Sequence, residues 1–519
     1  MASRRFFAVK LVVFYLAVLA FYTSAQECNQ QSFGSDSFVC VCSGSSCDYI
    51  GDVPPPADTS SFTIVSSSKD SDRFAVGLGT MDSLQNSGVT ITVDPSVRYQ
   101  TMMGFGGAFT DSTGFNVAKL SAETQESLLR SYFAPEGIRY SLCRVPIAGS
   151  DFSTRPYSYD DVPGDVNLDN FALAEEDYLY KLPFMKRALE LVSGTSDLKF
   201  FGSPWAPPAW MKTNGMANGS GSLLTEMWGP YSNYLVKFIS AYEEEGVPIW
   251  GITTQNEPMT GFSDWPWNTC AWTAEDQRDW IKTNLGPAFV DAGYDDVKIM
   301  VLDHNREFLP DYPAAILEDP ETYKYVDGIA VHWYSDNNDY PDRLTSTHDL
   351  FPDKFLLYTE SCEGWNAAPG NRVELGSWQR AQNYVVNIID DVTHYSTGWV
   401  DWNMALDQEG GPNWVSNFVD SPVIVNAAED TFYKQPMFYA MGHFSRFVLP
   451  GDVAVDRSIS DESQIRAATF VKPDGTVVAV ILNMAEEVVP VSIQPSVGAD
   501  FYANLMVPGK SLHTLLFAV

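Results

Sequence analysis

The chain has 519 residues, and its 66 Asp and Glu against 32 Lys and Arg give a formal net charge of −34. That charge repels phosphate backbones, so we expect no nucleic-acid partner recognised through a basic surface. Apolar residues make up 45% of the chain and aromatic residues 13%, which excludes disorder along its whole length. At roughly 150 residues per domain, the length predicts about three domains.

The first 25 residues have the pattern of a secretory signal peptide. Arg4, Arg5 and Lys10 precede an apolar run from Leu11 to Tyr22, and small residues follow as far as Ala25. A membrane anchor is the alternative, but the apolar run is shorter than the ~20 residues that cross a bilayer. We therefore predict cleavage after Ala25 and entry into the secretory pathway. No later segment is apolar for long enough to predict a transmembrane helix.

Cysteines are concentrated just after this segment. Four of the seven lie close together: Cys28, Cys40, Cys42 and Cys47. In an oxidising compartment, two local disulfides are the expected state of these four. A zinc knuckle is the competing interpretation, but the spacing of Cys42 and Cys47 exceeds that of a C-x₂-C pair, and no His lies nearby. The other three, Cys143, Cys270 and Cys362, stand in apolar surroundings and are predicted to be structural.

Strand-like segments dominate both ends of the remaining chain. A stiff proline-rich linker is predicted at 52–56. Residues 61–93 then alternate apolar and polar side chains, and residues 453–519 show the same alternating, strand-like pattern. We expect the two segments to form one β-sandwich. Between them, eight apolar runs alternate with amphipathic stretches, which predicts a parallel TIM (β/α)₈ barrel and an α/β fold class. The predicted barrel strands are Met103–Ala108, Tyr140–Pro146, Lys199–Ser203, Ile249–Thr254, Lys298–Asp303, Gly328–Trp333, Phe355–Thr359 and Trp399–Asn403.

The predicted organisation has four parts. Residues 1–25 are the signal peptide, and residues 26–51 with 404–435 form a small β domain that holds the two disulfides. Residues 54–99 with 452–519 form the sandwich, and residues 100–403 with 436–451 form the catalytic barrel.

Two glutamates stand at the carboxyl ends of predicted barrel strands, where this fold carries its chemistry. Glu257 follows the fourth strand and Glu360 the seventh, among Trp, Tyr, Asn and Asp residues that suit the apolar faces and hydroxyl rim of a sugar. We expect glycoside hydrolysis by one protonated and one ionised carboxyl group, about 5–5.5 Å apart if configuration is retained. Glu257 is assigned as acid/base because the Asn256 amide beside it could bind a sugar hydroxyl. Glu360 is assigned as nucleophile, with Tyr334 placed to hydrogen-bond it.

Other chemistries find weaker support. An arbitrary Glu in a chain with this many acids is a solvated surface residue, so both assignments depend on strand position and neighbours. The six His residues form no H-E-x-x-H pair, so we expect neither a catalytic metal nor a cofactor. His332 is predicted to be buried and hydrogen-bonded rather than a proton donor. The glycine-rich run at 104–108 does not continue as G-x-G-x-x-G, because Phe109 takes the third glycine position, and no G-x-S-x-G elbow occurs.

A family resemblance rests on nine motifs spread along nearly the whole mature chain. They are Gly104-Phe-Gly-Gly-Ala108, Arg144-Val-Pro146, Ser203-Pro-Trp205, Lys212-Thr-Asn-Gly215, Asn256-Glu-Pro258, Gly328-Ile-Ala-Val-His-Trp-Tyr334, Glu409-Gly-Gly-Pro-Asn-Trp414, Phe418-Val-Asp-Ser-Pro422 and Asp430-Thr-Phe-Tyr-Lys-Gln-Pro-Met-Phe438. In these the chain resembles the acid β-glucosidases, or glucocerebrosidases, of glycoside hydrolase family 30. The resemblance implies a retaining β-glucosidase that acts on glucosylceramide, either in the lysosomal lumen or after secretion. It also implies the pairs Cys28–Cys40 and Cys42–Cys47.

The same resemblance implies roles for further residues. Carried over by position, five residues would bind glucose: Asp151, Trp205, Asn256, Trp402 and Asn417. Arg144 and Tyr334 would support the two glutamates. The loops at 265–270, 335–340 and 361–370 depart from the mammalian enzyme, and they would meet the ceramide, a saposin-like activator or an anionic lipid surface.

Two alternatives to a glucosylceramidase stay open. Related family members are β-xylosidases or β-1,6-glucanases, and a catalytically silent sugar- or lipid-binding protein is a third interpretation, against which the two glutamates argue. An acid/base glutamate must hold its proton, so we expect an acidic working pH. The sequon at Asn218 predicts a glycosylated surface loop.

Overall fold

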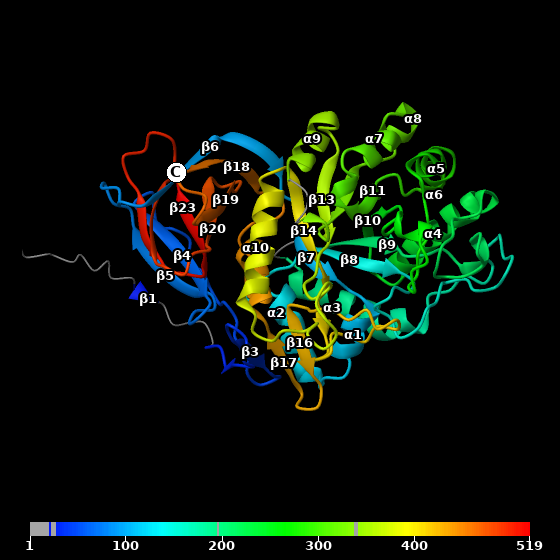
Figure 1. Cartoon of the computed structure of the whole chain (residues 1–519), viewed down its shortest axis with the longest axis horizontal. Helices are drawn as coiled ribbons and strands as arrows, with labels where there is room; N and C mark the ends of the chain where they lie inside the picture. Colours follow the sequence, from blue (N-terminus) through cyan, green and yellow to red (C-terminus); the bar gives the residue numbers. More distant parts are fainter. Residues whose placement is uncertain (1–19, 22–26, 195–196, 337–340) are drawn as a thin grey trace, which may run out of the picture.

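The computed structural model describes residues 20–21, 27–194, 197–336 and 341–519, and nearly all of the predicted signal peptide lies outside these ranges. The described residues form a closed eight-stranded barrel, a ten-stranded sheet and a five-stranded sheet. Figure 1 shows the barrel and the ten-stranded sheet at opposite ends of the molecule, with the small sheet below the barrel. The predicted fold class, a TIM barrel with an all-β sandwich and a small disulfide-bonded β domain, is confirmed.

The barrel strands are parallel and almost fully buried, because helices cover the outside and side chains fill the inside. In chain order they are β7 (Gly104–Ala108), β8 (Leu142–Ile147), β9 (Lys199–Pro204), β10 (Ile249–Thr253), β11 (Lys298–Asn305), β12 (Gly328–His332), β13 (Phe355–Glu360) and β14 (Ser396–Asn403). Each overlaps one predicted strand. Gly106 is required where β7 approaches β8, since a Cβ atom there would lie 1.7 Å from the Leu142 carbonyl oxygen.

Helices surround the barrel. They are α1 (Asp111–Val117), α2 (Ala122–Phe133), α3 (Leu182–Val192), α4 (Trp228–Glu244), α5 (Ala274–Trp280), α6 (Gly286–Ala292), α7 (Asp311–Leu317), α8 (Pro320–Tyr323), α9 (Asp342–Leu350), α10 (Trp378–Val392) and α11 (Pro436–Ser445). Helix α10 lies between the barrel and the ten-stranded sheet (Figure 1), and apolar residues at helical spacing from Ala381 to Val392 are buried there. None of the described helices has the length and apolarity needed to cross a membrane.

The ten-stranded sheet draws on both ends of the chain. Its strands are β1 (Ala20–Phe21), β4 (Ser61–Ser68), β5 (Ala75–Thr80), β6 (Val89–Thr101), β18 (Val453–Ile459), β19 (Ile465–Val471), β20 (Thr476–Asn483), β21 (Val489–Gln494), β22 (Ala503–Val507) and β23 (Ser511–Ala518). Strand β6 joins the two halves, since it pairs antiparallel with β18 and parallel with β21. Side chains from early and late strands, such as Ile91 and Phe517, share one apolar core.

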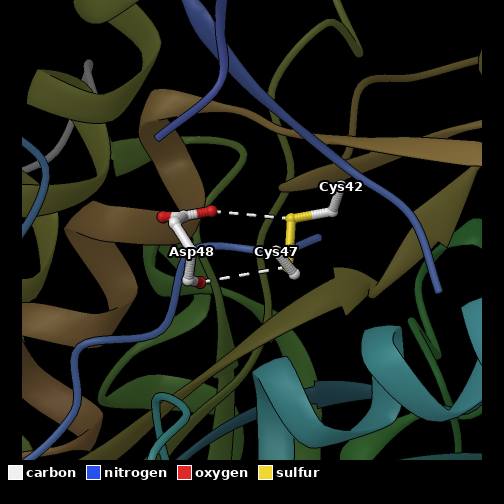
Figure 2. Close-up of side chains that lie close together, drawn as sticks. All are labelled: Cys42, Cys47 and Asp48. Carbon is white, nitrogen blue, oxygen red and sulfur yellow. Dashed lines mark hydrogen bonds between the residues drawn. A yellow bond between two sulfur atoms is a disulfide. The ribbon is translucent and has the colours of Figure 1, made fainter. Parts of the chain in front are cut away.

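The small sheet carries both disulfides. It contains β2 (Gln30–Gln31), β3 (Val39–Cys42), β15 (Ala405–Leu406), β16 (Val423–Asn426) and β17 (Thr431–Lys434). Cys28 is bonded to Cys40 and Cys42 to Cys47, which are the pairs that the family resemblance implies. In Figure 2 the Asp48 carboxylate lies beside the second disulfide, 3.5 Å from Cys42 Sγ. Because the S–S bond engages both sulfurs, these residues do not form the alternative zinc knuckle.

Candidate active site

Both predicted catalytic glutamates lie at the carboxyl-terminal mouth of the barrel. Glu360 is the last residue of β13, and Glu257 lies in the loop that follows β10. The Glu257 backbone has a φ of 47°, and its N–H donates to the Asp303 carbonyl oxygen at 2.9 Å. This non-glycine residue is held in the left-handed region by the contact with β11, a form of backbone strain typical of functional sites.

Glu360 is held by two donors. The Tyr334 hydroxyl donates to Glu360 Oε1 at 2.7 Å, and the Arg144 guanidinium donates to Oε2. Arg144 is wholly buried and Glu360 is 7% exposed. Both carboxylate oxygens are thereby oriented before any substrate arrives, and the arrangement includes the contact between Tyr334 and Glu360 that the sequence predicts.

Arg144 connects four strands of the barrel. Its Nε donates to Ser203 Oγ at 2.9 Å, and one terminal nitrogen donates to Asn256 Oδ1 at 2.8 Å and to Asp303 Oδ2 at 2.7 Å. Because Asn256 uses its oxygen to accept from Arg144, its NH₂ group is the end suited to contact a sugar hydroxyl. The positive charges of Arg144 and His332 hold the pKa of Asp303 well below its usual value, despite the burial of that carboxyl group.

Glu257 is coupled to a histidine. His332 Nε2 lies 3.0 Å from Asp303 Oδ1, and its Nδ1 lies 3.5 Å from Glu257 Oε1. Burial would lower the pKa of His332, but Glu360, Asp303 and Glu257 raise it to about 9. Burial likewise would raise the pKa of Glu257, but His332, His304 and Arg144 hold it below its usual value. His332 is therefore buried and hydrogen-bonded, as the sequence predicts, and its charge favours the ionised form of Glu257, the form that an acid/base residue needs in the second step rather than the first.

A second histidine flanks Glu257 on another side. His304 Nδ1 lies 3.9 Å from Glu257 Oε1, and its ring packs on Phe308 with centroids 4.7 Å apart. Burial lowers the pKa of His304 to about 4, so the ring is neutral at neutral pH.

Asp151 occupies a third position in the mouth. Its Oδ2 accepts from Asn417 at 3.1 Å and from Asn413 at 3.0 Å. Burial raises the pKa of Asp151 to about 7, and the charges of Glu360 and Glu257 act in the same direction. Asp151 and Asn417 are thus brought together, and Asn413 is a positioning residue within one of the family motifs.

Two aromatic side chains form a wall of the mouth. The Trp205 and Trp402 rings are stacked with centroids 5.0 Å apart and an interplanar angle of 21°. The Arg144 guanidinium lies over both rings, 4.8 Å from Trp205 and 5.4 Å from Trp402. All of the carried-over glucose residues therefore lie around the same group of polar side chains.

Other predicted residues lie elsewhere or outside the described chain. Asn218 is half-buried and forms an isolated antiparallel bridge with Asn268, and its side-chain nitrogen donates to the Pro266 carbonyl oxygen at 3.1 Å. In the loop that contacts Asn218, Trp265 and Trp267 stack with centroids 4.6 Å apart. Of the rim loop at 335–340, only residues 335–336 are described.

Asp303, His304 and Asn413 were not singled out from the sequence. For Asp303 a signal existed, because an acid at the carboxyl end of a predicted apolar strand lies at the functional edge of a barrel. His304 follows it directly. Asn413 offered no signal beyond its place in a motif, since its role depends on a contact with a residue 262 positions earlier.

Comparisons with known proteins cover both the barrel and the sandwich. The family model described as "Glycosyl hydrolase family 30 TIM-barrel domain" matches residues 102–448. The model described as "Glycosyl hydrolase family 30 beta sandwich domain" matches residues 452–515. The lysosomal acid glucosylceramidase of Mus musculus is 42% identical over 98% of this chain and 99% of its own. Putative glucosylceramidase 3 of Caenorhabditis elegans is 40% identical over 95% of each chain. Among solved structures, the endo-beta1,6-glucanase BT3312 has a TM-score of 0.77 and 28% identity, over 88% of this chain and 99% of its own.

Proposed function

Because the chain belongs to glycoside hydrolase family 30, we propose that it hydrolyses the β-glucosidic bond of glucosylceramide to release glucose and ceramide. The mouse and C. elegans relatives described above are a glucosylceramidase and a putative glucosylceramidase, and both align with nearly the whole chain. The buried polar mouth suits a single glucose unit, because Asp151, Asn256 and the two stacked Trp side chains offer hydrogen bonds and an apolar wall.

The first chemical step uses the two glutamates in different roles. A carboxylate oxygen of Glu360 attacks the anomeric carbon, and the bond from that carbon to the ceramide oxygen breaks. Glu257 transfers its proton to the departing oxygen, so ceramide leaves as a neutral alcohol. Arg144 and Tyr334 hold the attacking carboxylate in place, which lowers the entropy cost of orienting it in the transition state.

The second step reverses the proton transfer. Water attacks the anomeric carbon, Glu257 takes one water proton, and the bond to Glu360 breaks to release β-glucose. Glu360 loses its negative charge while it is esterified by the sugar. Since that charge raises the pKa of His332, the proton affinity of the adjoining His332 and Glu257 falls at this stage, when Glu257 must be a base.

The proposal rests on one observation. Glu360 is bound by Arg144 and Tyr334, and the residue that pairs with it in the sheet, His332, is the one that contacts Glu257. We expect Glu360→Gln to abolish turnover of glucosylceramide and to leave the circular dichroism spectrum unchanged. The matched control is Glu318→Gln, since the Glu318 carboxylate is exposed at the C-terminal end of helix α7, away from the barrel mouth, and the variant should stay active. An active Glu360→Gln protein would remove the nucleophile assignment.

The acid/base role has its own test. With Glu257→Gln, cleavage of glucosylceramide should be lost, whereas a β-glucoside with an activated phenol as leaving group should still glucosylate Glu360, because that leaving group needs no proton. Equal losses for both substrates would contradict the role. Proton NMR of the first released glucose should show the β anomer, and the α anomer would exclude retention.

A β-1,6-glucanase is the second candidate activity, favoured by the structural similarity to BT3312. The purified protein should be compared on glucosylceramide, a β-xyloside and a β-1,6-linked glucan. Faster turnover of either of the latter two would replace the proposed substrate.

Localisation and partners follow from the same relatives. A lysosomal relative and the N-terminal signal pattern favour a secretory or lysosomal lumenal protein. Removal of residues 1–25, which hold three cations and no acid, takes the formal charge from −34 to −37. An anionic lipid surface and a saposin-like activator are the partners we propose for presentation of the lipid, and turnover in vesicles with and without each of them tests this.

A further inference from the structure

Three side chains around the acid/base glutamate form a group suited to a metal ion. Glu257, His304 and His332 each offer one ligand atom, and these atoms lie within 4.8 Å of one another. The Glu257 oxygen is 3.5 Å from His332 Nδ1 and 3.9 Å from His304 Nδ1. In a tetrahedral zinc site with bonds of about 2.1 Å, ligand atoms lie about 3.4 Å apart, so side-chain shifts below 1 Å would close the group around an ion.

The two imidazoles point unused nitrogen atoms at this position. His304 is 6% exposed and His332 is fully buried, yet neither His304 Nδ1 nor His332 Nδ1 has a hydrogen-bond partner within the described part of the chain. Buried polar atoms are almost always paired, and these two nitrogens face the Glu257 oxygen at 3.5 Å and 3.9 Å without forming a hydrogen bond, so an ion between them and the carboxylate would supply the missing contacts.

His332 also contacts a carboxylate through its second ring nitrogen, as metal-binding histidines commonly do. Its other nitrogen, Nε2, lies 3.0 Å from Asp303 Oδ1, and Asp303 is itself bound by Arg144 and by the Thr253 hydroxyl at 2.6 Å. A carboxylate on the far nitrogen of an imidazole retains the proton there, so the near nitrogen of His332 can coordinate a metal once the ion displaces its proton to solvent. Two imidazoles and one glutamate are also a ligand set that zinc accepts with a fourth position open to water.

We propose that Glu257, His304 and His332 form an inhibitory site for a divalent transition metal, with Zn²⁺ as the ion that best fits the ligands. A bound ion would engage the Glu257 carboxylate and remove it from proton transfer to the leaving group. Hard cations such as Mg²⁺ prefer oxygen ligands and should not bind here. The binding of zinc stands on geometry alone, whereas its inhibitory effect rests on the proposed acid/base role of Glu257.

The test compares zinc binding and activity in the full chain at pH 7. Calorimetric titration with ZnCl₂ should give one site, MgCl₂ should give none, and turnover lost to Zn²⁺ should return with EDTA. His304→Phe should weaken zinc binding by at least about tenfold, because it removes a ligand and keeps an aromatic ring against Phe308. The matched control is His348→Phe, since His348 stacks on Tyr395 with centroids 3.8 Å apart and the variant should bind zinc like the parent.

Two results would overturn the proposal. One is zinc binding by His304→Phe that equals that of the parent. The other is an X-ray absorption spectrum of the zinc-loaded parent that lacks two imidazole ligands, a measurement that does not depend on how any variant folds. If zinc binds as expected but turnover is unchanged, the acid/base role of Glu257 is contradicted, whereas the metal site itself is supported.

Discussion

Asp151 links the stability of the barrel mouth to pH. Its carboxyl group is 7% exposed, and burial raises its pKa from 3.8 to about 7. Between these values the folded chain keeps a proton that the unfolded chain releases. The stabilising contribution of Asp151 is therefore complete below about pH 4 and is lost as the pH rises towards 7.

The size of this effect follows from the pKa values. Each pH unit in that window removes about 1.4 kcal/mol, so the free energy of unfolding should fall by about 2 kcal/mol from pH 5 to pH 7 through Asp151 alone. At an unfolding entropy of about 2 cal/mol/K per residue, a chain of this length gains or loses about 1 °C in Tm per kcal/mol. The Asp151 contribution to the Tm difference is thus about 2 °C.

The assay is differential scanning calorimetry of the parent and Asp151→Asn at pH 5 and pH 7. Asparagine has nearly the same shape and binds no proton, so the fall in Tm between the two pH values should be about 2 °C smaller in the variant. Asp264→Asn is the control, because Asp264 is exposed on a loop and its variant should behave like the parent. An equal fall in parent and Asp151→Asn would refute the protonation of Asp151 in the folded chain.

Three further predictions follow from the same site and from the charge of the chain. His332→Gln removes a positive charge that lowers the pKa of Glu257, so the alkaline limb of the kcat/KM profile should move to higher pH, and an unmoved limb would separate His332 from the proton on Glu257. Asn413→Ala removes one of two amide donors to Asp151, a contact worth about 1 kcal/mol to the carboxyl group that stays protonated at acidic pH, so kcat/KM for a soluble β-glucoside should drop about fivefold, which steady-state kinetics would measure. Binding to vesicles of anionic phospholipid at pH 7 should strengthen in sedimentation assays as salt is added, because salt screens repulsion from a chain of charge −34 or below; weaker binding in salt would reveal a local basic patch.

Local patterns in the sequence predict much of the architecture. The eight apolar runs identify the barrel strands to within a few residues, since burial on both faces of a parallel sheet produces continuous apolar segments of limited length. Strand ends then single out Glu257 and Glu360 as candidate catalytic residues, because barrels of this kind carry their chemistry at the carboxyl edge. The family resemblance added Asp151 and Asn417 by position, and no local pattern reveals their proximity.

Only the tertiary structure decided which residues of the site are hydrogen-bonded to one another. Asp303 lies 159 residues from Arg144, and Asn413 lies 262 residues from Asp151, yet each pair is joined by a hydrogen bond. Whether an acid keeps its proton depends on burial and on every charge within a few ångströms, and those neighbours are set by closure of the barrel rather than by adjacent residues. For this reason the sequence identifies Glu257 as the acid/base candidate, but only the fold shows that two histidines flank it.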